Sequence, residues 1–247
     1  MTTVAPDPHH TPVSGIRPHH RVFRVPGVYP VQRDTWLLAD VLRRELDDHG
    51  CGPDRPCRVL ELGAGAGALS VVAAGVANTE VTAVDLSRRA LLSTRINATR
   101  HGRRVRVRRG DLTAPVARER FDVVVSNPPY VPTDTDDLPE HGIARAFDGG
   151  RDGRLVLDRV CVEAPRVLAP GGRLLVVHSA FNDPALTVAR LREQGMTAEV
   201  VLRHEHPFGP VLTARRALLR ERGLVTDDQV TEELVVVRAV RPHPSES

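Results

Sequence analysis

Four consecutive residues form the sharpest chemical pattern in the chain: Asn127, Pro128, Pro129 and Tyr130, which directly follow the apolar run Phe121–Ser126. Two prolines in a row fix an extended segment that has no backbone N–H donors. The Asn127 amide oxygen and the Pro128 carbonyl are then free to accept one N–H each, while Tyr130 packs on a planar group. We predict that these four residues are catalytic and orient a planar amide or amino nitrogen for attack.

A nitrogen of this kind is a weak nucleophile, because its lone pair is delocalised into the neighbouring π system. Two hydrogen bonds from its N–H groups to fixed oxygens polarise it and aim the lone pair at an electrophile. This chemistry relies on positioning and electrostatics and needs no covalent intermediate with the protein. A turn without function is the alternative, but its place after a buried strand favours a catalytic role.

A glycine-rich turn follows another apolar strand. Glu61 lies near the end of that strand, Gly63, Gly65 and Gly67 follow it, and a helix is predicted to start near Gly67. Glycines allow a tight turn and a close approach of the backbone to a ligand at the helix N-terminus. We therefore predict that these four residues bind a cofactor. The same spacing also satisfies the NAD fingerprint when Ala68 is included, so the turn alone leaves both cofactors open.

Further carboxylates stand at the ends of the next two predicted strands. Asp85 is placed where a ribose diol is hydrogen-bonded. Asp111 is placed to accept an adenine amino group, and the backbone N–H of Leu112 to reach the ring. NAD enzymes have no general need for this last acid. Three acids at successive strand ends therefore favour S-adenosylmethionine as the cofactor.

The elements that hold these residues alternate between strands and helices. Apolar runs predict strands at Arg58–Leu62, Glu80–Val84, Arg104–Arg108, Phe121–Ser126, Arg173–His178, Ala198–Arg203 and Leu234–Val240. Helical spacing predicts helices at Asp34–Leu46 with Asp34 as N-cap, Ser87–Arg100, Leu155–Leu168, Pro184–Gln194 and Leu212–Arg222. Such alternation is typical of an α/β fold. We predict a Rossmann-like, seven-stranded class I methyltransferase sheet, mostly parallel, whose last strand is antiparallel beside the fifth.

One domain is predicted over residues 21–241, with residues 21–50 as an N-terminal lid and helix. Residues 1–20 and 242–247 are expected to be flexible tails. All 34 Lys and Arg residues are arginine, so no lysine is available for a Schiff base or a P-loop. No Cys and His cluster has metal-ligand spacing, so no metal is predicted. The absence of signal-peptide and membrane-span patterns leads us to expect a cytoplasmic protein.

These motifs resemble those of the HemK-type protein-glutamine methyltransferases, in the short branch that lacks the N-terminal helical domain. The resemblance covers roughly residues 27–240. It rests on Val28-Tyr29-Pro30, Asp34-Thr35-Trp36-Leu37-Leu38, Glu61-Leu62-Gly63-Ala64-Gly65, Asp85, Asp111, Asn127-Pro128-Pro129-Tyr130-Val131-Pro132, Ala146-Phe147-Asp148-Gly149-Gly150-Arg151-Asp152-Gly153 and Glu233-Leu234-Val235-Val236-Val237-Arg238.

The resemblance implies methylation of a glutamine side-chain amide, in the family the Gly-Gly-Gln glutamine of a translation release factor. It implies cofactor contacts from Thr35, Glu61, Gly63, Asp85, Asp111, Leu112 and Asn127. Archaeal and eukaryotic members use a small zinc-binding activator subunit. One position departs from the family pattern, because Arg33 stands where the family usually has a glutamate before Asp34-Thr35.

Other functions fit parts of the pattern. An N6-adenine methyltransferase of nucleic acid uses the same Asn-Pro-Pro-Tyr turn but needs base flipping and usually a target-recognition region. This chain has no spare domain for that purpose, and its aromatic content is 3%. A small-molecule amide or guanidine is another acceptor class. A cofactor-binding adapter without turnover is disfavoured by the intact catalytic turn, and a NAD dehydrogenase by that turn and Asp111.

Overall fold

The computed structural model describes residues 22–48 and 55–243. The predicted tail over residues 1–20 lies outside these ranges, as do residues 244–247 of the predicted C-terminal tail. Among the helices within the described ranges, none has the length and apolar composition needed to cross a membrane.

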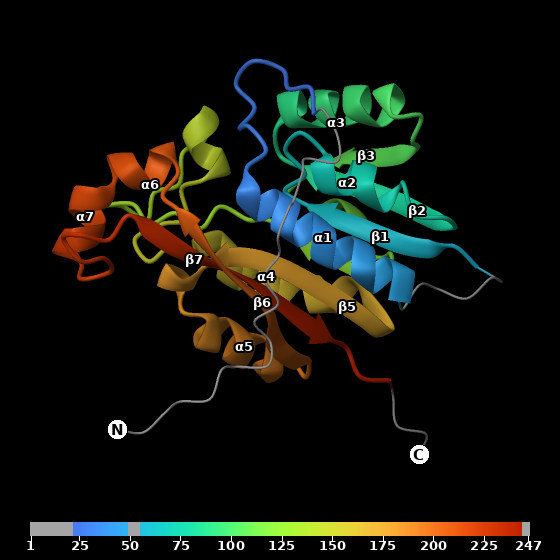
Figure 1. Cartoon of the computed structure of the whole chain (residues 1–247). Helices are drawn as coiled ribbons and strands as arrows, with labels where there is room; N and C mark the ends of the chain where they lie inside the picture. The colour runs from blue at the N-terminus through green and yellow to red at the C-terminus, as the bar shows by residue number, and fades with distance from the viewer. Residues whose placement is uncertain (1–21, 49–54, 244–247) are drawn as a thin grey trace.

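Seven strands form one sheet in the order β3-β2-β1-β4-β5-β7-β6 (Figure 1). They are β1 Cys57–Leu62, β2 Thr79–Asp85, β3 Val105–Arg109, β4 Phe121–Ser126, β5 Leu168–Ser179, β6 Thr197–Pro207 and β7 Thr231–Val240. The strands from β3 to β5 pair in parallel, whereas β7 is antiparallel to both β5 and β6. The predicted α/β class and the antiparallel last strand beside the fifth are confirmed.

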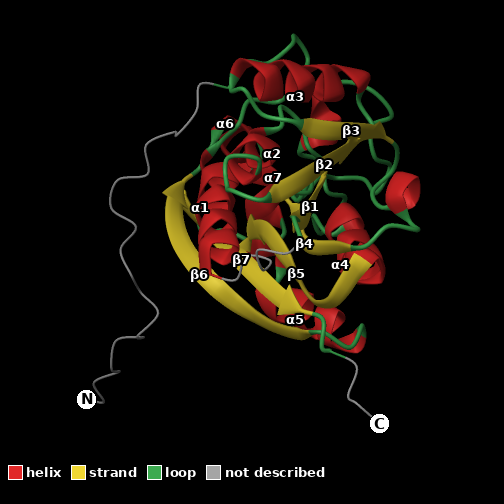
Figure 2. Cartoon of the chain, turned by 90° about the vertical axis from the view of Figure 1, so that its right-hand side faces the viewer, coloured by secondary structure: helices red, strands yellow, loops and turns green. Residues whose placement is uncertain are grey.

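Helices cover both faces of this twisted sheet (Figure 2). They are α1 Arg33–Asp48, α2 Ala68–Ala73, α3 Arg88–Arg100, α4 Leu155–Val167, α5 Pro184–Glu193, α6 Pro210–Ala214 and α7 Arg216–Glu221. Helix α1 packs against α2 and crosses β5 and β7, while α4 and α5 pack together on strands of the other face. The short helices α6 and α7 lie in the insert between β6 and β7.

Side chains of β1 alternate between two hydrophobic cores. Leu60 and Leu62 belong to the core beneath α4 and α5, whereas Val59 belongs to the core beneath α1 and α2. All three are fully buried, because helices cover both faces of the sheet. Glu61 interrupts this apolar strand with a buried carboxylate, which therefore needs hydrogen-bond partners.

Two C-terminal strands are longer than the sequence predicts. Strand β5 begins at Leu168 and runs through Pro170-Gly171-Gly172, whereas the sequence predicts a strand only from Arg173. The carbonyl of Gly172 accepts a 2.8 Å hydrogen bond from the N–H of Arg241, so backbone pairing continues there. Strand β6 continues to Pro207 because its backbone pairs with β7 along this whole length.

The predicted inserted helix Leu212–Arg222 is two helices in the structure. The break falls at Arg215, whose backbone has φ −97° and ψ 7°. Its guanidinium donates to the Pro132 carbonyl at 3.0 Å and pairs with Asp148. The insert is thereby tied to the segment that follows the Asn-Pro-Pro-Tyr turn.

Parallel strands bring the predicted site residues to one edge of the sheet. Gly63 directly follows β1, Asp85 ends β2, Asp111 comes shortly after β3, and Asn127 directly follows β4. In open α/β sheets, ligands bind beyond the carboxyl ends of the strands. This edge is therefore where a functional site is to be sought.

Candidate active site

A cavity of about 340 Å³ lies at the carboxyl edge of β1, β2, β3 and β4. The predicted site residues that line it are Thr35, Glu61, Gly63, Gly65, Asp85, Asp111, Leu112, Asn127 and Pro129. The predicted residues Gly67, Pro128 and Tyr130 do not line it. Its volume lies within the range of roughly 300–1,000 Å³ that is common for small-molecule sites.

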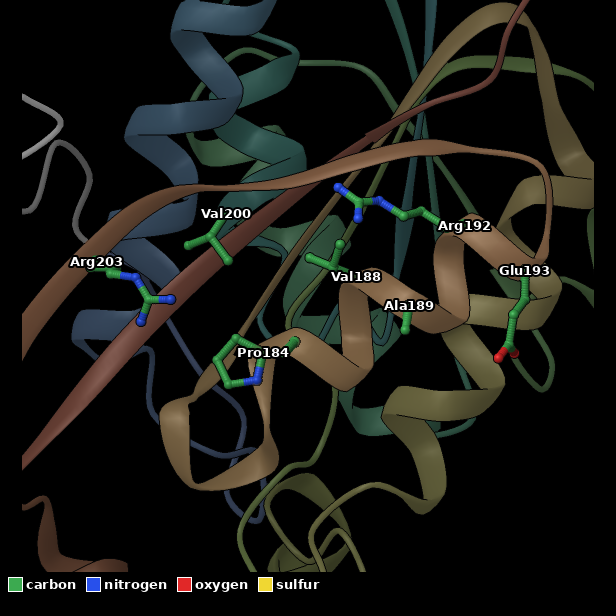
Figure 3. A pocket seen from close by; sticks show the side chains of 8 residues that line it. Pro184, Val188, Ala189, Arg192, Glu193, Val200 and Arg203 are labelled. Carbon is green, nitrogen blue, oxygen red and sulfur yellow. The ribbon is translucent and has the colours of Figure 1, made fainter.

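A larger hollow of about 700 Å³ lies elsewhere, between α5 and β6 (Figure 3). Val188 and Val200 contribute apolar walls, and two arginines reach its rim. Both arginines are engaged: Arg192 donates to a backbone carbonyl of β6 at 3.0 Å, and Arg203 pairs with Glu233 at 2.5 Å. This hollow contains none of the predicted site residues, so size alone does not identify the active site.

The three glycines after β1 have two different roles. A Cβ built at Gly63 or Gly65 meets nothing within 4 Å, so the backbone there faces open space in the cavity. A Cβ at Gly67 lies 2.6 Å from the side chain of Thr94 on α3. Gly63 and Gly65 therefore form a cradle that a ligand can approach closely, whereas Gly67 allows α2 and α3 to pack.

Glu61 is a buried carboxylate of the cavity wall. Its Oε2 accepts a 2.9 Å hydrogen bond from the N–H of Ser70 and a second one from the Ser70 hydroxyl. Burial raises the pKa of Glu61 to about 8, and the neighbouring Asp85 adds to this rise. A cationic ligand in the cavity favours the ionised form of this group.

Asp85 holds the glycine turn from the end of β2. Its Oδ2 accepts the N–H of Gly65 at 2.8 Å, and its Oδ1 accepts the N–H of Ser87 at 2.7 Å. Burial raises its pKa, which these two hydrogen bonds oppose. A carboxylate has about four acceptor positions, so Asp85 can still receive ribose hydroxyls.

Asp111 and Leu112 also line the cavity. Asp111 pairs with Arg159 of α4 at 2.9 Å and is about half exposed. Leu112 has a φ of +41°, a left-handed conformation that bulky residues rarely adopt. Such strain often marks a functional position, and Leu112 borders the cavity.

The side-chain amide of Asn127 is oriented by α1. Its Nδ2 donates to Thr35 Oγ1 at 3.0 Å, and the Thr35 hydroxyl lies 3.2 Å from Asp34 Oδ1, to which it can donate. Both Thr35 and Asn127 line the cavity. This arrangement leaves the carbonyl oxygen of Asn127 as the atom that can accept an N–H from a ligand.

Tyr130 does not line the cavity. Only 8% of its surface is exposed, and its hydroxyl donates to Asp34 Oδ2 at 2.8 Å. The predicted N-cap role of Asp34 is wrong, because α1 begins one residue earlier and the carboxylate binds Tyr130 and Thr35. A small void of about 40 Å³, separate from the cofactor cavity, lies beside Tyr130 and Asp34, and of the described residues only Tyr29 borders both.

Arg33, the departure from the family pattern, borders this small void and not the cofactor cavity. Its Nη2 lies 3.4 Å from His204 Nε2 on β6. Burial lowers the pKa of His204, and the positive charge of Arg33 lowers it further. Arg33 therefore lies outside the set of residues that line the cofactor cavity.

Several cavity residues are absent from the sequence prediction. Tyr29 belongs to the segment before α1, and Arg145 and Glu140 belong to the loop after the catalytic turn. Tyr29 stands in the family-like Val-Tyr-Pro pattern, which is a usable signal. Arg159 lies on a helix with other arginines nearby, and no local pattern singles it out.

Comparison with known proteins agrees with this geometry. The methyltransferase small domain family model matches residues 22–205. A sequence from Methanocaldococcus jannaschii, provisionally named a protein N5-glutamine methyltransferase, is 33% identical over 61% of this chain and 76% of that one. A release factor glutamine methyltransferase of Deinococcus radiodurans is 39% identical over 79% of this chain and 66% of its own length.

A solved structure shows the same architecture. It is Mtq2 in the E. cuniculi Mtq2–Trm112 complex, which methylates the eRF1 translation termination factor. The TM-score is 0.60 and the identity 26%, over 87% of this chain and 99% of that one. Together with the strand-end carboxylates and the glycine cradle, these matches exclude the alternative that the chain is a NAD dehydrogenase. The chain belongs to the methyltransferase small domain family, with the HemK-type protein-glutamine methyltransferases as its relatives and S-adenosylmethionine as its cofactor.

Proposed function

We propose that this chain transfers the methyl group of S-adenosylmethionine to the side-chain amide nitrogen of a glutamine in a protein, with the Gly-Gly-Gln segment of a translation release factor as the acceptor. The observation that carries the proposal is the Asn127 amide, which is held by Thr35 at 3.0 Å beside the cofactor cavity. The names of the archaeal and bacterial relatives support the acceptor class.

The cofactor would be held by the residues that line the cavity. Gly63 and Gly65 provide a close backbone approach, since nothing within 4 Å occupies the space of a side chain there. Asp85 is proposed to accept the ribose hydroxyls, and Asp111 and the Leu112 N–H to bind the adenine. Glu61 is proposed to face the cationic methionine part, and Thr35 and Asn127 to border the transferred methyl group.

The protein's part in the reaction is orientation. Asn127 Oδ1 accepts one N–H of the acceptor amide, and the Pro128 carbonyl accepts the other. These contacts pull electron density onto the nitrogen and aim its lone pair into the cavity. When bound in the cavity, S-adenosylmethionine would supply an electrophilic methyl group on its sulfonium. Transfer of this methyl group to the nitrogen would leave the demethylated cofactor, and the proton that the amide nitrogen loses would pass to water.

The direct test is methyl transfer to defined acceptors. The purified chain is incubated with labelled S-adenosylmethionine and a release factor, and the tryptic peptides are mapped by mass. We expect one added methyl group on the glutamine of Gly-Gly-Gln and none on a factor that carries asparagine there. Labelling of an oligonucleotide adenine with no labelling of the factor would support the N6-adenine alternative.

The assay also tests whether the chain needs a small partner subunit. Mtq2 is in complex with Trm112 in the structure similar to this chain. The assay is therefore run with the chain alone and with a co-purified small zinc-binding subunit. Activity of the chain alone would show that the proposed reaction needs no such partner.

A further inference from the structure

We propose that Asp34 is a positioning residue for methyl transfer, which fixes the Asn127 amide in its reactive orientation through the hydroxyl of Thr35. This inference rests on the proposed function of Asn127 and adds a residue that touches neither the cofactor cavity nor the acceptor. Asp34 is absent from the cavity lining, although its neighbour Thr35 belongs to it.

The direction of each hydrogen bond follows from Asp34. Its Oδ1 accepts the N–H of Thr35 at 2.6 Å and lies 3.2 Å from the Thr35 hydroxyl oxygen. A carboxylate is only an acceptor, so the hydroxyl hydrogen of Thr35 points at Asp34. The lone pairs of Thr35 Oγ1 then face Asn127 at 3.0 Å, and the amide must present Nδ2 to them.

This orientation decides which atom of Asn127 faces the acceptor. An amide side chain is nearly symmetric in shape, and rotation by half a turn exchanges its oxygen and nitrogen. With Nδ2 bound to Thr35, Oδ1 is available to accept an N–H of the substrate. In the reverse orientation Nδ2 would face the substrate, and two N–H groups would oppose one another.

The other carboxylate oxygen of Asp34, Oδ2, also accepts a hydrogen bond. Tyr130 donates its hydroxyl to Oδ2 at 2.8 Å. Burial raises the pKa of Tyr130 well above its usual value, so this hydroxyl keeps its proton and remains a donor. Asp34 thus connects to both ends of the catalytic turn, directly at Tyr130 and through Thr35 at Asn127.

Double-mutant kinetics test the role of Asp34. We expect Asp34→Ala to lower kcat on the order of 10²-fold, as for a misplaced catalytic group, with little change in the cofactor Kd. In an Asn127→Ala background the same change should cause no further loss, because Asp34 acts through Asn127. Asp34→Asn keeps an acceptor for Thr35 and should retain more activity than Asp34→Ala.

Two further variants test whether Asp34 acts through Thr35 and Asn127 or through its contact with Tyr130. Tyr130→Phe removes the second contact of Asp34 but leaves the Thr35–Asn127 link, so its kcat should fall less than that of Asp34→Ala. Asp47→Ala is the matched control on α1, because Asp47 is exposed and pairs with Arg43 on the same helix at 3.6 Å. Equal losses from Asp34→Ala with and without Asn127 would overturn the proposal.

An NMR measurement made without any methyl acceptor tests the positioning role of Asp34 separately from the proposed release-factor substrate. The side-chain NH₂ signals of Asn127 are identified in ¹⁵N spectra by their loss in Asn127→Ala. We expect them to shift in Asp34→Ala and to stay unchanged in Asp47→Ala. Unchanged signals in Asp34→Ala would refute the positioning role. Shifted signals in a protein that does not methylate release factors would uphold this role and refute the proposed substrate.

Discussion

The N–H of Gly65 donates a 2.8 Å hydrogen bond to Asp85 Oδ2, across the gap between the turn after β1 and the end of β2. The carboxylate proposed to bind ribose thus also fixes the cradle that faces the cofactor. Its second oxygen accepts the N–H of Ser87, which begins the turn into α3. One side chain therefore links cofactor binding to the local fold.

Asp85→Ala should weaken cofactor binding and also lower the melting temperature. The ribose contact alone is worth on the order of 1.5–3 kcal/mol, as for a hydrogen bond to a charged group. The loss of the Gly65 and Ser87 contacts adds a stability cost that a ligand contact alone would not produce. Calorimetry and thermal unfolding measure both effects. Glu80→Ala is the control, because Glu80 is an exposed acid on the same strand. An unchanged Kd would place the ribose elsewhere.

Cofactor affinity should rise with pH because of Glu61. Burial raises its pKa to about 8, so the carboxyl is mostly neutral at pH 7 when no cofactor is bound. A cationic ligand favours the carboxylate, and the proton must leave when it binds. The Kd is therefore expected to fall as the pH rises toward about 8 and then level off. Calorimetry in buffers of different ionisation enthalpy detects the released proton.

The same group has the opposite effect on stability in the absence of cofactor. The folded protein holds the Glu61 proton up to about pH 8, whereas the unfolded chain releases it near the ordinary value of 4.5. The contribution of this group to the free energy of unfolding is therefore full below 4.5 and is lost as the pH rises toward 8. Glu61→Gln should flatten both pH dependences. Identical profiles for Glu61→Gln and the wild type would exclude Glu61 as their source.

The loop after the catalytic turn should respond to the cofactor in one part only. Residues Leu138, Glu140 and Arg145 line the cofactor cavity, and Arg145 holds the Glu140 carbonyl at 2.7 Å. The flanking part is already paired in the structure, since Val131 bridges to Asp148. We expect amide exchange to slow over residues 138–146 when cofactor is added. Amide exchange at the paired flank should change little. Equal slowing in both parts would contradict a response confined to residues 138–146.

The positions of the strands along the chain and the residues at their ends follow from the sequence, because buried parallel strands are apolar runs followed by polar residues. Glu61, Asp85, Asp111 and Asn127 all lie at the cavity for this reason. The turn after β1 is predictable on the same grounds. Its glycines nevertheless divide into cavity and packing roles, since only the fold brings Thr94 against Gly67.

Contacts between distant segments are beyond such a prediction. Tyr130 is expected at the acceptor but is buried against Asp34, which is far away in sequence. The insert helix breaks at Arg215 where its guanidinium reaches the catalytic segment, and no local pattern signals that break. Strand β6 extends through His204 and His206 because β7 pairs with its backbone, although the run of four polar residues from Arg203 to His206 carries no apolar strand pattern.

Asn127→Ala should nearly abolish methyl transfer while leaving the fold intact. The residue is half-buried at a strand end, outside the apolar cores, so its truncation should cost little stability. Loss of one preorganised group for the reacting atoms lowers turnover by about 10²–10³. Turnover on the identified acceptor, with cofactor Kd and melting temperature as controls, gives the comparison. Near wild-type turnover would exclude the polarising role of this amide.

Asn127→Asp is the sharper variant because it keeps the size of the side chain and replaces the N–H donor by an oxygen. In the wild type, Thr35 Oγ1 accepts from Asn127 and points its hydrogen at Asp34. In Asn127→Asp, the new carboxylate and that of Asp34 would compete for the single hydroxyl hydrogen of Thr35. The two negative charges would also repel each other across Thr35. We expect turnover on a neutral amide to fall at least as far as in Asn127→Ala. Combining Asn127→Asp with Asp34→Asn removes the repulsion and should restore part of the turnover. No recovery in the double variant would mean that the charge at residue 127 acts on the acceptor itself and not through Thr35.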